Sequence, residues 1–272
     1  MQELREIQKI EIEALDELDR ICKKHGINYY LAQGTLLGAV RQNAFIPWDD
    51  DIDVLVHAEE MERLIQKFAE EADKKYFITN HNIEKYNPLS WTKIRCNNTA
   101  SMPRKYKKIP IHWGICIDIF PFYNVSDNFL LRKAEIFLFK AARKLLLMPM
   151  VEYDEKKSVL DKIILKIPLD TRKRLANSFM RALKRNNGKE TECVYVTCKG
   201  GKVIEKEIIC GKKRTQIFEG KEYPVPSDSE AFLSIMFGDD YMTPPPEAER
   251  KGHEQRMGEI IWDCHNSYEK YQ

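Results

Sequence analysis

The sequence contains one acidic cluster that any fold of this chain must accommodate. Asp49, Asp50, Asp51 and Asp53 lie within five residues. Carboxylates this close repel one another, so the cluster lowers stability unless a cation neutralises it. The apolar residues that follow predict a β-strand over residues 52–56. Because side chains two residues apart on a strand point to the same side, Asp51 and Asp53 are expected to share one face.

Asp118 is the best candidate for a third carboxylate. It interrupts the apolar strand predicted over residues 114–120, where an isolated buried charge would be costly. Two carboxylates on one face and a third from another strand form the hard oxygen site that Mg²⁺ or Mn²⁺ prefers. We therefore predict that Asp51, Asp53 and Asp118 hold a divalent metal.

Other interpretations of these carboxylates stay open. An isolated Asp-X-Asp also occurs in solvated loops and in structural calcium sites. Asp118 alone fits a core or capping carboxylate equally well. Asp49 and Asp50 fit N-capping or a supporting role better than direct metal binding.

A glycine-led turn, Gly34-Thr35, precedes the acidic cluster and opens a short helix predicted over residues 34–41. The start of such a helix presents free N–H groups and a positive dipole end, both of which favour phosphate. The Thr35 hydroxyl adds a cap or a ligand. Phosphate donors beside a metal-binding cluster indicate phosphoryl or nucleotidyl transfer. Alone, the Gly-Thr pair is a weak signal, because most such pairs are ordinary turns.

Helices and strands are interleaved over the first 125 residues, which predicts a mixed α/β core. The expected helices cover residues 3–25 and about 59–73. The expected strands cover residues 28–32, 52–56, 91–96 and 114–120, the last stopped by Pro121. After a helical region, short strands at 193–197 and 216–218 and one helix near 228–237 are expected.

The helical region, residues 127–186 with breaks at Pro149 and Pro168, is basic. Between residues 129 and 186 there are 15 Lys and Arg against 6 Asp and Glu. Basic residues beside a broad apolar face can bind an anionic membrane. The alternative is that the apolar side packs on the core and the charges pair with its carboxylates. We expect a catalytic core over 1–126, a helical insert over 127–188 and a C-terminal part over 189–272 that completes the site.

Composition narrows the class of protein. With 44 Lys and Arg against 42 Asp and Glu, the net charge of +2 gives no support to nucleic-acid binding. No apolar run reaches the ~18 residues that span a bilayer, and the N-terminus lacks a secretion signal. We therefore expect a cytoplasmic protein. Its seven cysteines include no Cys-X-X-Cys pair and fit reduced thiols; a zinc site at Cys193, Cys198 and Cys210 is the alternative.

The segment from Gly34 to Val54 closely resembles the LicD family, which includes bacterial phosphocholine transferases and is related to the fukutin-type proteins. The likeness rests on Gly34-Thr35-Leu36-Leu37-Gly38 and on Phe45-Ile46-Pro47-Trp48-Asp49-Asp50-Asp51-Ile52-Asp53-Val54. It recurs at Lys93-Ile94-Arg95, at residues 114–121, 218–226 and 241–246, and at His253. One departure is Gln42-Asn43-Ala44, where family members often have His-X-Gly, so no histidine can act at position 42.

The resemblance implies a nucleotidyltransferase-like fold and a CDP-activated donor, most of all CDP-choline. The phospho-alcohol would pass to a hydroxyl of a cell-surface glycan, of teichoic acid or lipopolysaccharide type, or to its lipid-linked precursor. Such an acceptor would place the protein at the inner face of the cell membrane. Gly34, Thr35 and Gly38 would cradle the donor phosphates. One carboxylate among Asp51, Asp53 and Asp118 would take the acceptor proton.

Further candidates for substrate contacts carry positive charge or an aromatic ring. Arg41, Lys93 and Arg95 are expected to bind phosphate. Trp48 and Trp91 could stack on cytosine or enclose a quaternary ammonium, although core packing explains them as well. His253 is a substrate-binding candidate whose alternative is a solvated surface histidine.

Two other functions stay open. The same machinery could use CDP-ribitol, CDP-glycerol or a nucleoside triphosphate, or the chain could be a catalytically inert protein that binds a glycan or nucleotide. An aromatic cage in the pocket would favour choline, whereas hydrogen-bonding groups would favour a polyol. Intact metal ligands argue against an inert protein.

Overall fold

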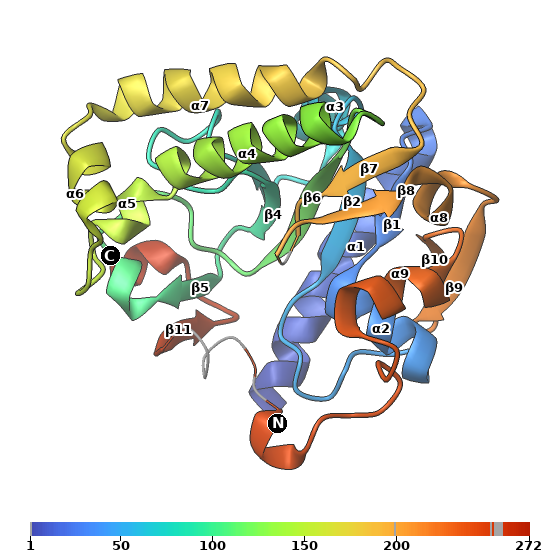
Figure 1. Ribbon diagram of the computed structural model, residues 1–272. Coiled ribbons are helices and arrows are strands. Elements are labelled where there is room, and N and C mark those ends of the chain that lie inside the picture. The colour runs from blue at the N-terminus through green and yellow to red at the C-terminus, as the bar shows by residue number, and fades with distance from the viewer. Residues whose placement is uncertain (1, 199, 251, 253–257) are drawn as a thin grey trace.

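A mixed β-sheet forms the centre of the computed structural model, which describes residues 2–198, 200–250, 252 and 258–272 (Figure 1). In this described part the sheet has seven strands, with β1, β2, β6, β4 and β3 side by side and β7 and β8 continuing from β6. Strands β2 and β6 are parallel, and the other pairs are antiparallel. The strands are β1 (Tyr29–Leu31), β2 (Asp53–His57), β3 (Tyr76–Thr79), β4 (Thr92–Cys96), β6 (Cys116–Asn124), β7 (Cys193–Val196) and β8 (Lys202–Glu205). The predicted mixed α/β fold is confirmed.

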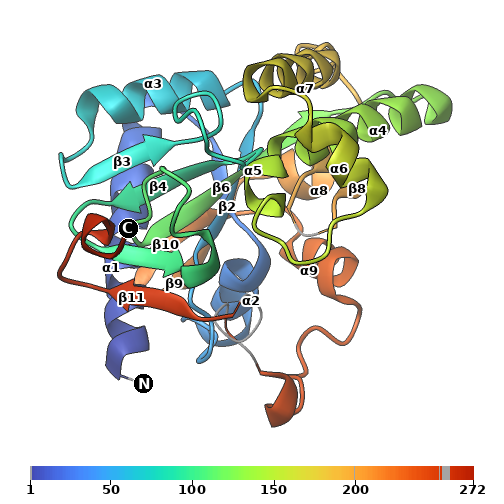
Figure 2. The same ribbon diagram turned by 90° about the vertical axis from the view of Figure 1, so that its left-hand side faces the viewer.

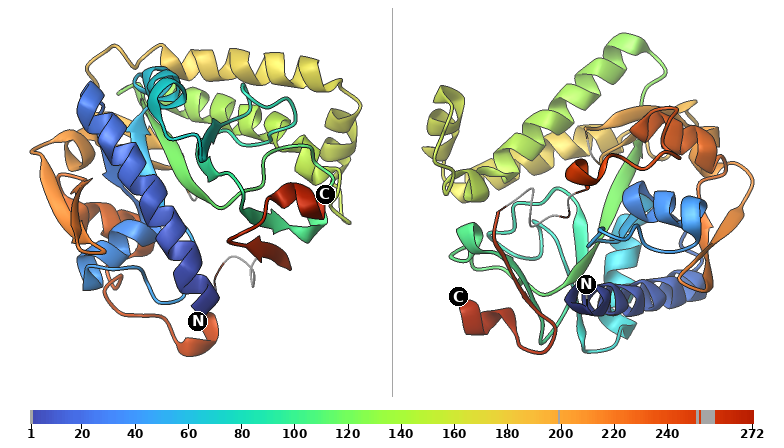
Figure 3. Two further views of the ribbon diagram at one scale, coloured as in Figure 1. Left: turned by 180° about the vertical axis from the view of Figure 1, so that it is seen from behind. Right: turned by 90° about the horizontal axis from the view of Figure 1, so that it is seen from below.

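Helix α1 (Gln2–His25) crosses one face of the sheet (Figure 3, left). Its apolar residues recur at helical spacing, and Leu15, Leu18 and Ile21 are fully buried in the main core. Gly26 follows with a positive φ of 61°, a backbone conformation that favours glycine and ends the helix. The helix predicted over residues 3–25 is therefore confirmed.

The helical region contains four helices: α4 (Phe129–Leu146), α5 (Met148–Val151), α6 (Val159–Leu165) and α7 (Leu169–Lys184). Helices α4 and α7 lie side by side along one edge of the molecule (Figures 1 and 2). They enclose a second core cluster that includes Phe139, Leu183 and Tyr195. As expected, Pro149 and Pro168 stand where helices begin: Pro149 in the first turn of α5 and Pro168 just before α7.

Two small antiparallel pairs flank the sheet. The hairpin of β9 (Arg214–Phe218) and β10 (Lys221–Val225) lies beside β1. Strand β11 (Ile260–Asp263) pairs with β5 (Ala100–Pro103), as Figure 2 shows. The other helices are α2 (Gln33–Gln42), α3 (Met61–Glu71), α8 (Lys206–Cys210) and α9 (Ser229–Phe237), with short 3₁₀ turns at Arg104–Tyr106, Glu247–Glu249 and Tyr268–Tyr271. Among the described helices, none combines the length and the hydropathy that crossing a bilayer requires.

The expected end of the central strand at Pro121 is wrong, because β6 continues to Asn124. The last β6 residue paired with β4 is Ile119, and pairing with β7 begins at Phe122. Pro121 therefore lies at the changeover between two partner strands, where no ladder hydrogen bond is needed from its nitrogen. Its carbonyl oxygen accepts a hydrogen bond of 2.6 Å from the Thr197 hydroxyl.

Candidate active site

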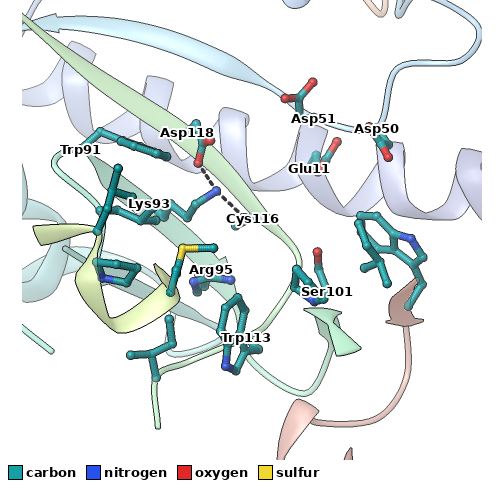
Figure 4. A pocket seen from close by; sticks show the side chains of 18 residues that line it. Glu11, Asp50, Asp51, Trp91, Lys93, Arg95, Ser101, Trp113, Cys116 and Asp118 are labelled. Carbon is teal, nitrogen blue, oxygen red and sulfur yellow. Dashed lines mark hydrogen bonds and ion pairs between the residues drawn. The ribbon is translucent and has the colours of Figure 1, made fainter. Parts of the chain in front are cut away.

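Three charged side chains form a row across neighbouring strands of the sheet. The strand register places Asp118 of β6 opposite Asp53 of β2 on one side and opposite Lys93 of β4 on the other. Residues paired across adjacent strands direct their side chains to the same face. Lys93 forms an ion pair with Asp118 and donates a hydrogen bond of 3.3 Å to Cys116 Sγ (Figure 4). Burial alone would lower the pKa of Lys93, but Asp118 and then Cys116 raise it by more, so Lys93 carries its charge.

Asp53 is buried at the start of β2 with other carboxylates around it. Its backbone N–H donates a 2.9 Å hydrogen bond to the Thr35 hydroxyl, which ties β2 to α2. Its Oδ1 has no hydrogen-bond partner among the described residues. Burial, and then Asp51, Asp118 and Asp49, raise the pKa of Asp53 well above its usual value. A bound cation would relieve the repulsion between Asp53 and these carboxylates.

The acidic loop before β2 is folded tightly. One oxygen each of Asp49, Asp50 and Asp51 lies within 4.8 Å of the others. Gln8 of α1 donates a 2.9 Å hydrogen bond to the Asp49 carbonyl oxygen. A Cβ atom at Gly34 would stand 2.2 Å from Asp49 Oδ2, so only glycine lets this carboxylate approach the start of α2. A negative group is favourable there because the first turn of α2 is the positive end of the helix.

This donor set fits a hard divalent cation. The unsatisfied Asp53 oxygen and the three clustered carboxylates supply the anionic oxygen atoms that Mg²⁺ or Mn²⁺ requires. In the described chain the tightest carboxylate group is Asp49, Asp50 and Asp51 rather than the predicted set of ligands. Asp53 and Asp118 are neighbours by register, and Asp51 influences Asp53 electrostatically. Joint binding of one metal by Asp51, Asp53 and Asp118 stays a prediction.

A cavity of about 270 Å³ lies beside this carboxylate region. Figure 4 shows Asp118, Asp51, Asp50 and Glu11 on one side of it and Arg95 and Trp113 on the other. Much of the remaining wall is apolar. It consists of Pro88, Leu89, Trp91, Pro103, Ile111, Leu147, Met150, Ile260 and Trp262. The cavity therefore joins an anionic end to a wall that contains three tryptophans.

Two of the tryptophans are held in place by their neighbours. Trp91 packs on Phe120 with ring centres 5.3 Å apart, and the Arg143 guanidinium lies 5.8 Å from the Trp91 ring centre. The Trp113 indole N–H donates a 3.0 Å hydrogen bond to the Ile109 carbonyl oxygen. Side chains fixed in this way lose little freedom when a ligand binds in the cavity beside them.

The two basic residues predicted on β4 both reach the cavity. Lys93 stands beside Asp118, whereas Arg95 is buried against Trp113, with 5.5 Å between its guanidinium carbon and the ring centre. Arg95 also donates a 2.9 Å hydrogen bond to the Gly114 carbonyl oxygen. The structure thus brings Asp51, Lys93, Arg95 and Asp118 to one cavity, and it adds Trp91 to them.

Glu11 is a cavity residue that the sequence did not point to. It projects from α1, is 1% exposed, and its Oε2 has no hydrogen-bond partner among the described residues. Burial, and then Asp51 and Cys116, raise its pKa well above the usual value. Trp113, Trp262 and Ser101 were also missed. Helix α1 contains many acidic residues, and nothing in the local sequence shows which of them points into the protein.

Several predicted substrate contacts do not line the cavity: Gly34, Thr35, Gly38, Arg41 and Trp48. A Cβ at Gly38 would stand 2.4 Å from the Ala44 carbonyl oxygen, so this glycine permits close backbone packing. Arg41 donates a hydrogen bond to the Tyr241 carbonyl oxygen, and the guanidinium of Arg250 lies 5.0 Å from the Trp48 ring centre. Roles of these residues in substrate binding stay predictions. His253 lies outside the described residues.

The described part of the chain shows no zinc site at the three cysteines considered for one. Cys193, Cys198 and Cys210 are free thiols that do not gather into a metal-binding group there. Cys198 instead accepts a 2.8 Å hydrogen bond from Gln33. Burial raises the pKa of Cys198 to about 12.

Known proteins share sequence similarity with this chain. Residues 26–154 match the family described as LicD/FKTN/FKRP, nucleotidyltransferase domain. The lipopolysaccharide cholinephosphotransferase LicD of Haemophilus influenzae is 28% identical over 278 residues, which cover 95% of this chain and 98% of that protein. An uncharacterized protein of Rickettsia prowazekii is 34% identical over 59 residues, or 21% of this chain and 22% of its own. Glu11 and Trp262 lie outside the matched domain.

Proposed function

Because residues 26–154 match the nucleotidyltransferase domain of the LicD/FKTN/FKRP family, we propose that the protein is a metal-dependent transferase of phosphocholine. The donor would be CDP-choline, and the acceptor a hydroxyl of a cell-surface glycan or of its lipid-linked precursor. The similarity to a lipopolysaccharide cholinephosphotransferase over almost the whole of both chains supports this reaction class.

The cavity is the observation that carries the choice of choline. A trimethylammonium group has no hydrogen to donate and binds to aromatic faces and to nearby negative charge. Trp91, Trp113 and Trp262 line one cavity together with four carboxylates. A polyol such as ribitol would need many hydrogen-bonding partners, whereas most of the wall away from the carboxylates is apolar.

In the proposed reaction, the acceptor oxygen forms a bond to the phosphorus of the phosphocholine group. The bond from that phosphorus to the CMP oxygen breaks, and CMP leaves. A divalent metal held by Asp51, Asp53 and Asp118 would neutralise negative charge on the phosphates. Lys93 and Arg95 add fixed positive charge beside the same phosphates. A carboxylate of the cluster accepts the proton of the acceptor hydroxyl.

The test is CMP release from CDP-choline, measured with lipopolysaccharide, teichoic acid or lipid-linked glycan as acceptor. We expect turnover with Mg²⁺ or Mn²⁺, its loss in EDTA, and slower turnover with CDP-glycerol or CDP-ribitol. Equal rates with CDP-ribitol would exclude choline specificity. Tight binding of CDP-choline without any turnover on the acceptor panel would indicate a binding protein instead.

A further inference from the structure

The most exposed apolar side chains of the described residues are concentrated on two helices. Seven large apolar residues are 56–76% exposed, and no other described one exceeds 48%. Four of the seven are on α4: Phe129, Leu130, Leu131 and Phe137. Three are on α6: Val159, Leu160 and Ile163. Concentrated exposure of this kind marks an interaction site.

The polar residues on these helices are sorted by charge. Every exposed residue on α4 and α6 is either apolar or lysine, namely Lys133, Lys140 or Lys162. None of these lysines forms an ion pair with a described residue. The single acidic residue of each helix is turned inward. Glu135 accepts hydrogen bonds from Ser126 and Asn186.

The inward acid of α6, Asp161, joins the two helices. It is buried, caps the start of α6 through Ser158, and forms an ion pair with Lys144 of α4. The short helix α5 lies between α4 and α6 (Figures 1 and 2). We call the exposed apolar residues and lysines of α4 and α6 the apolar–lysine surface.

We propose that the apolar–lysine surface binds the protein peripherally to an anionic phospholipid bilayer. Lysines beside exposed leucine and phenylalanine match a surface that is negative outside and hydrocarbon within. A second copy of this chain would present the same uncompensated lysines, so charge opposes self-association through this surface. The protein would attach to the surface of the bilayer without crossing it. None of the described helices is both long and apolar enough to cross a membrane.

The proposed surface is connected to the cavity. Leu147, directly after α4, and Met150 of α5 both line the cavity wall. If the proposed function holds, a bilayer at this surface would lie near the site where a lipid-linked acceptor reacts. The binding itself does not depend on the reaction.

The experiment is sedimentation of the full chain with vesicles of phosphatidylcholine alone or mixed with phosphatidylglycerol. We expect binding to the anionic vesicles only, and its loss at high salt. The double variant Lys133→Glu/Lys140→Glu should lose about tenfold or more in vesicle partitioning. Leu130→Ser/Phe137→Ser should lose binding already at low salt, although all lysines remain, because it removes the apolar contact. Arg143 and Lys144 are left intact because they contact Trp91 and Asp161.

The controls change exposed residues elsewhere in the chain. Lys212→Glu/Lys213→Glu reverses two exposed lysines, and Ile217→Ser removes an exposed apolar residue of β9. Both should bind vesicles like the wild type, and circular dichroism melting should show all variants folded. Absence of wild-type binding to anionic vesicles, equal loss in the controls, or a dimer in light scattering that Leu130→Ser/Phe137→Ser dissociates would each overturn the proposal. CMP release with a soluble acceptor tests the reaction separately.

Discussion

At the residue scale, Asp53 would link the proposed metal binding to stability. Its pKa is raised in the folded protein, first by burial and then by Asp51, Asp118 and Asp49. A raised pKa means that the folded state holds the proton more tightly than the unfolded state. Stability is therefore retained at low pH and falls as the pH rises from the unfolded pKa of about 4 through the folded pKa.

The Asp53→Asn variant should therefore be more stable than the wild type in EDTA at neutral pH. The gain should be about 1.4 kcal/mol for each pKa unit of the shift, and it should shrink as the pH approaches about 4. Urea unfolding in EDTA across this pH range measures it. Excess Mg²⁺ should reverse the order, because only the wild type keeps the full ligand set. A variant less stable than the wild type in EDTA would contradict the argument.

Loss of any one of the three proposed metal ligands should abolish catalysis without unfolding the protein. Asp51→Asn, Asp53→Asn and Asp118→Asn should each lower kcat/KM by more than about a hundredfold, since even outer-sphere changes cost 10–100-fold at metal sites. CMP release at saturating Mg²⁺ is the measurement. The exposed Asp240 provides the control, and Asp240→Asn should keep wild-type turnover. Near wild-type activity in any of the three variants would remove that residue from the ligand set.

Trp262 provides a test of choline recognition. A cation–π contact contributes about 0.5–2 kcal/mol, so Trp262→Leu should raise KM for CDP-choline about 2- to 30-fold. Trp262→Phe should retain part of the affinity, and KM for CDP-glycerol should change little in either variant. Trp48 does not line the cavity, so Trp48→Leu tests its predicted substrate contact separately from that of Trp262. Equal losses with both donors would mean that Trp262 only supports the wall.

At the scale of elements, the junction of α2 with the acidic loop depends on Gly34. Gly34→Ala would place a methyl group 2.2 Å from Asp49 Oδ2, so the Asp49 side chain must shift away from the start of α2. We expect Mg²⁺ affinity, measured by calorimetry, to fall about tenfold or more. Nothing lies within 4 Å of a Cβ at Gly188, so Gly188→Ala should bind Mg²⁺ normally. Unchanged affinity in Gly34→Ala would show that the loop adjusts at no cost to the metal site.

The elements themselves were largely predictable, but their association was not. Strong apolar periodicity identified α1 and the strands of Asp53 and Asp118, and a charge inside an apolar strand identified Asp118. The pairing of β5 with β11 joins segments more than 150 residues apart, and no local pattern indicates it. Trp262 therefore reaches the cavity through a contact that only the folded chain creates. The contact between Asp49 and Gly34 likewise forms only in the folded chain. From the sequence, Gly34 could therefore be interpreted only as part of a phosphate-binding turn.

At the scale of the whole molecule, the cavity joins parts of the protein that otherwise belong to different core clusters. Its walls come from α1, the acidic loop, β4, β5, β6, α5 and β11. CDP-choline with Mg²⁺ at a hundred times its Kd should stabilise the protein by about 2.7 kcal/mol, which raises Tm by about 5 °C or more. Differential scanning fluorimetry measures the shift, and hydrogen exchange should slow in β11 and α5.

The donor alone should give a smaller shift, because its phosphates would face the carboxylates without a cation between them. Asp118→Asn is the control and should lose most of the combined effect. If CDP-choline raises Tm equally with Mg²⁺ and with EDTA, recognition does not involve the metal.

The distribution of the cavity walls along the chain also suggests a use for this protein. The carboxylates Glu11, Asp50, Asp51 and Asp118 all precede the exposed Gly188, whereas Trp262 and strand β7 follow it. A chain divided at Gly188 would leave β6 without β7 and β5 without β11 in one fragment. Neither fragment could form the complete cavity, so the proposed release of CMP would return only when the two fragments meet. The protein is therefore a candidate for a split-enzyme reporter of molecular proximity.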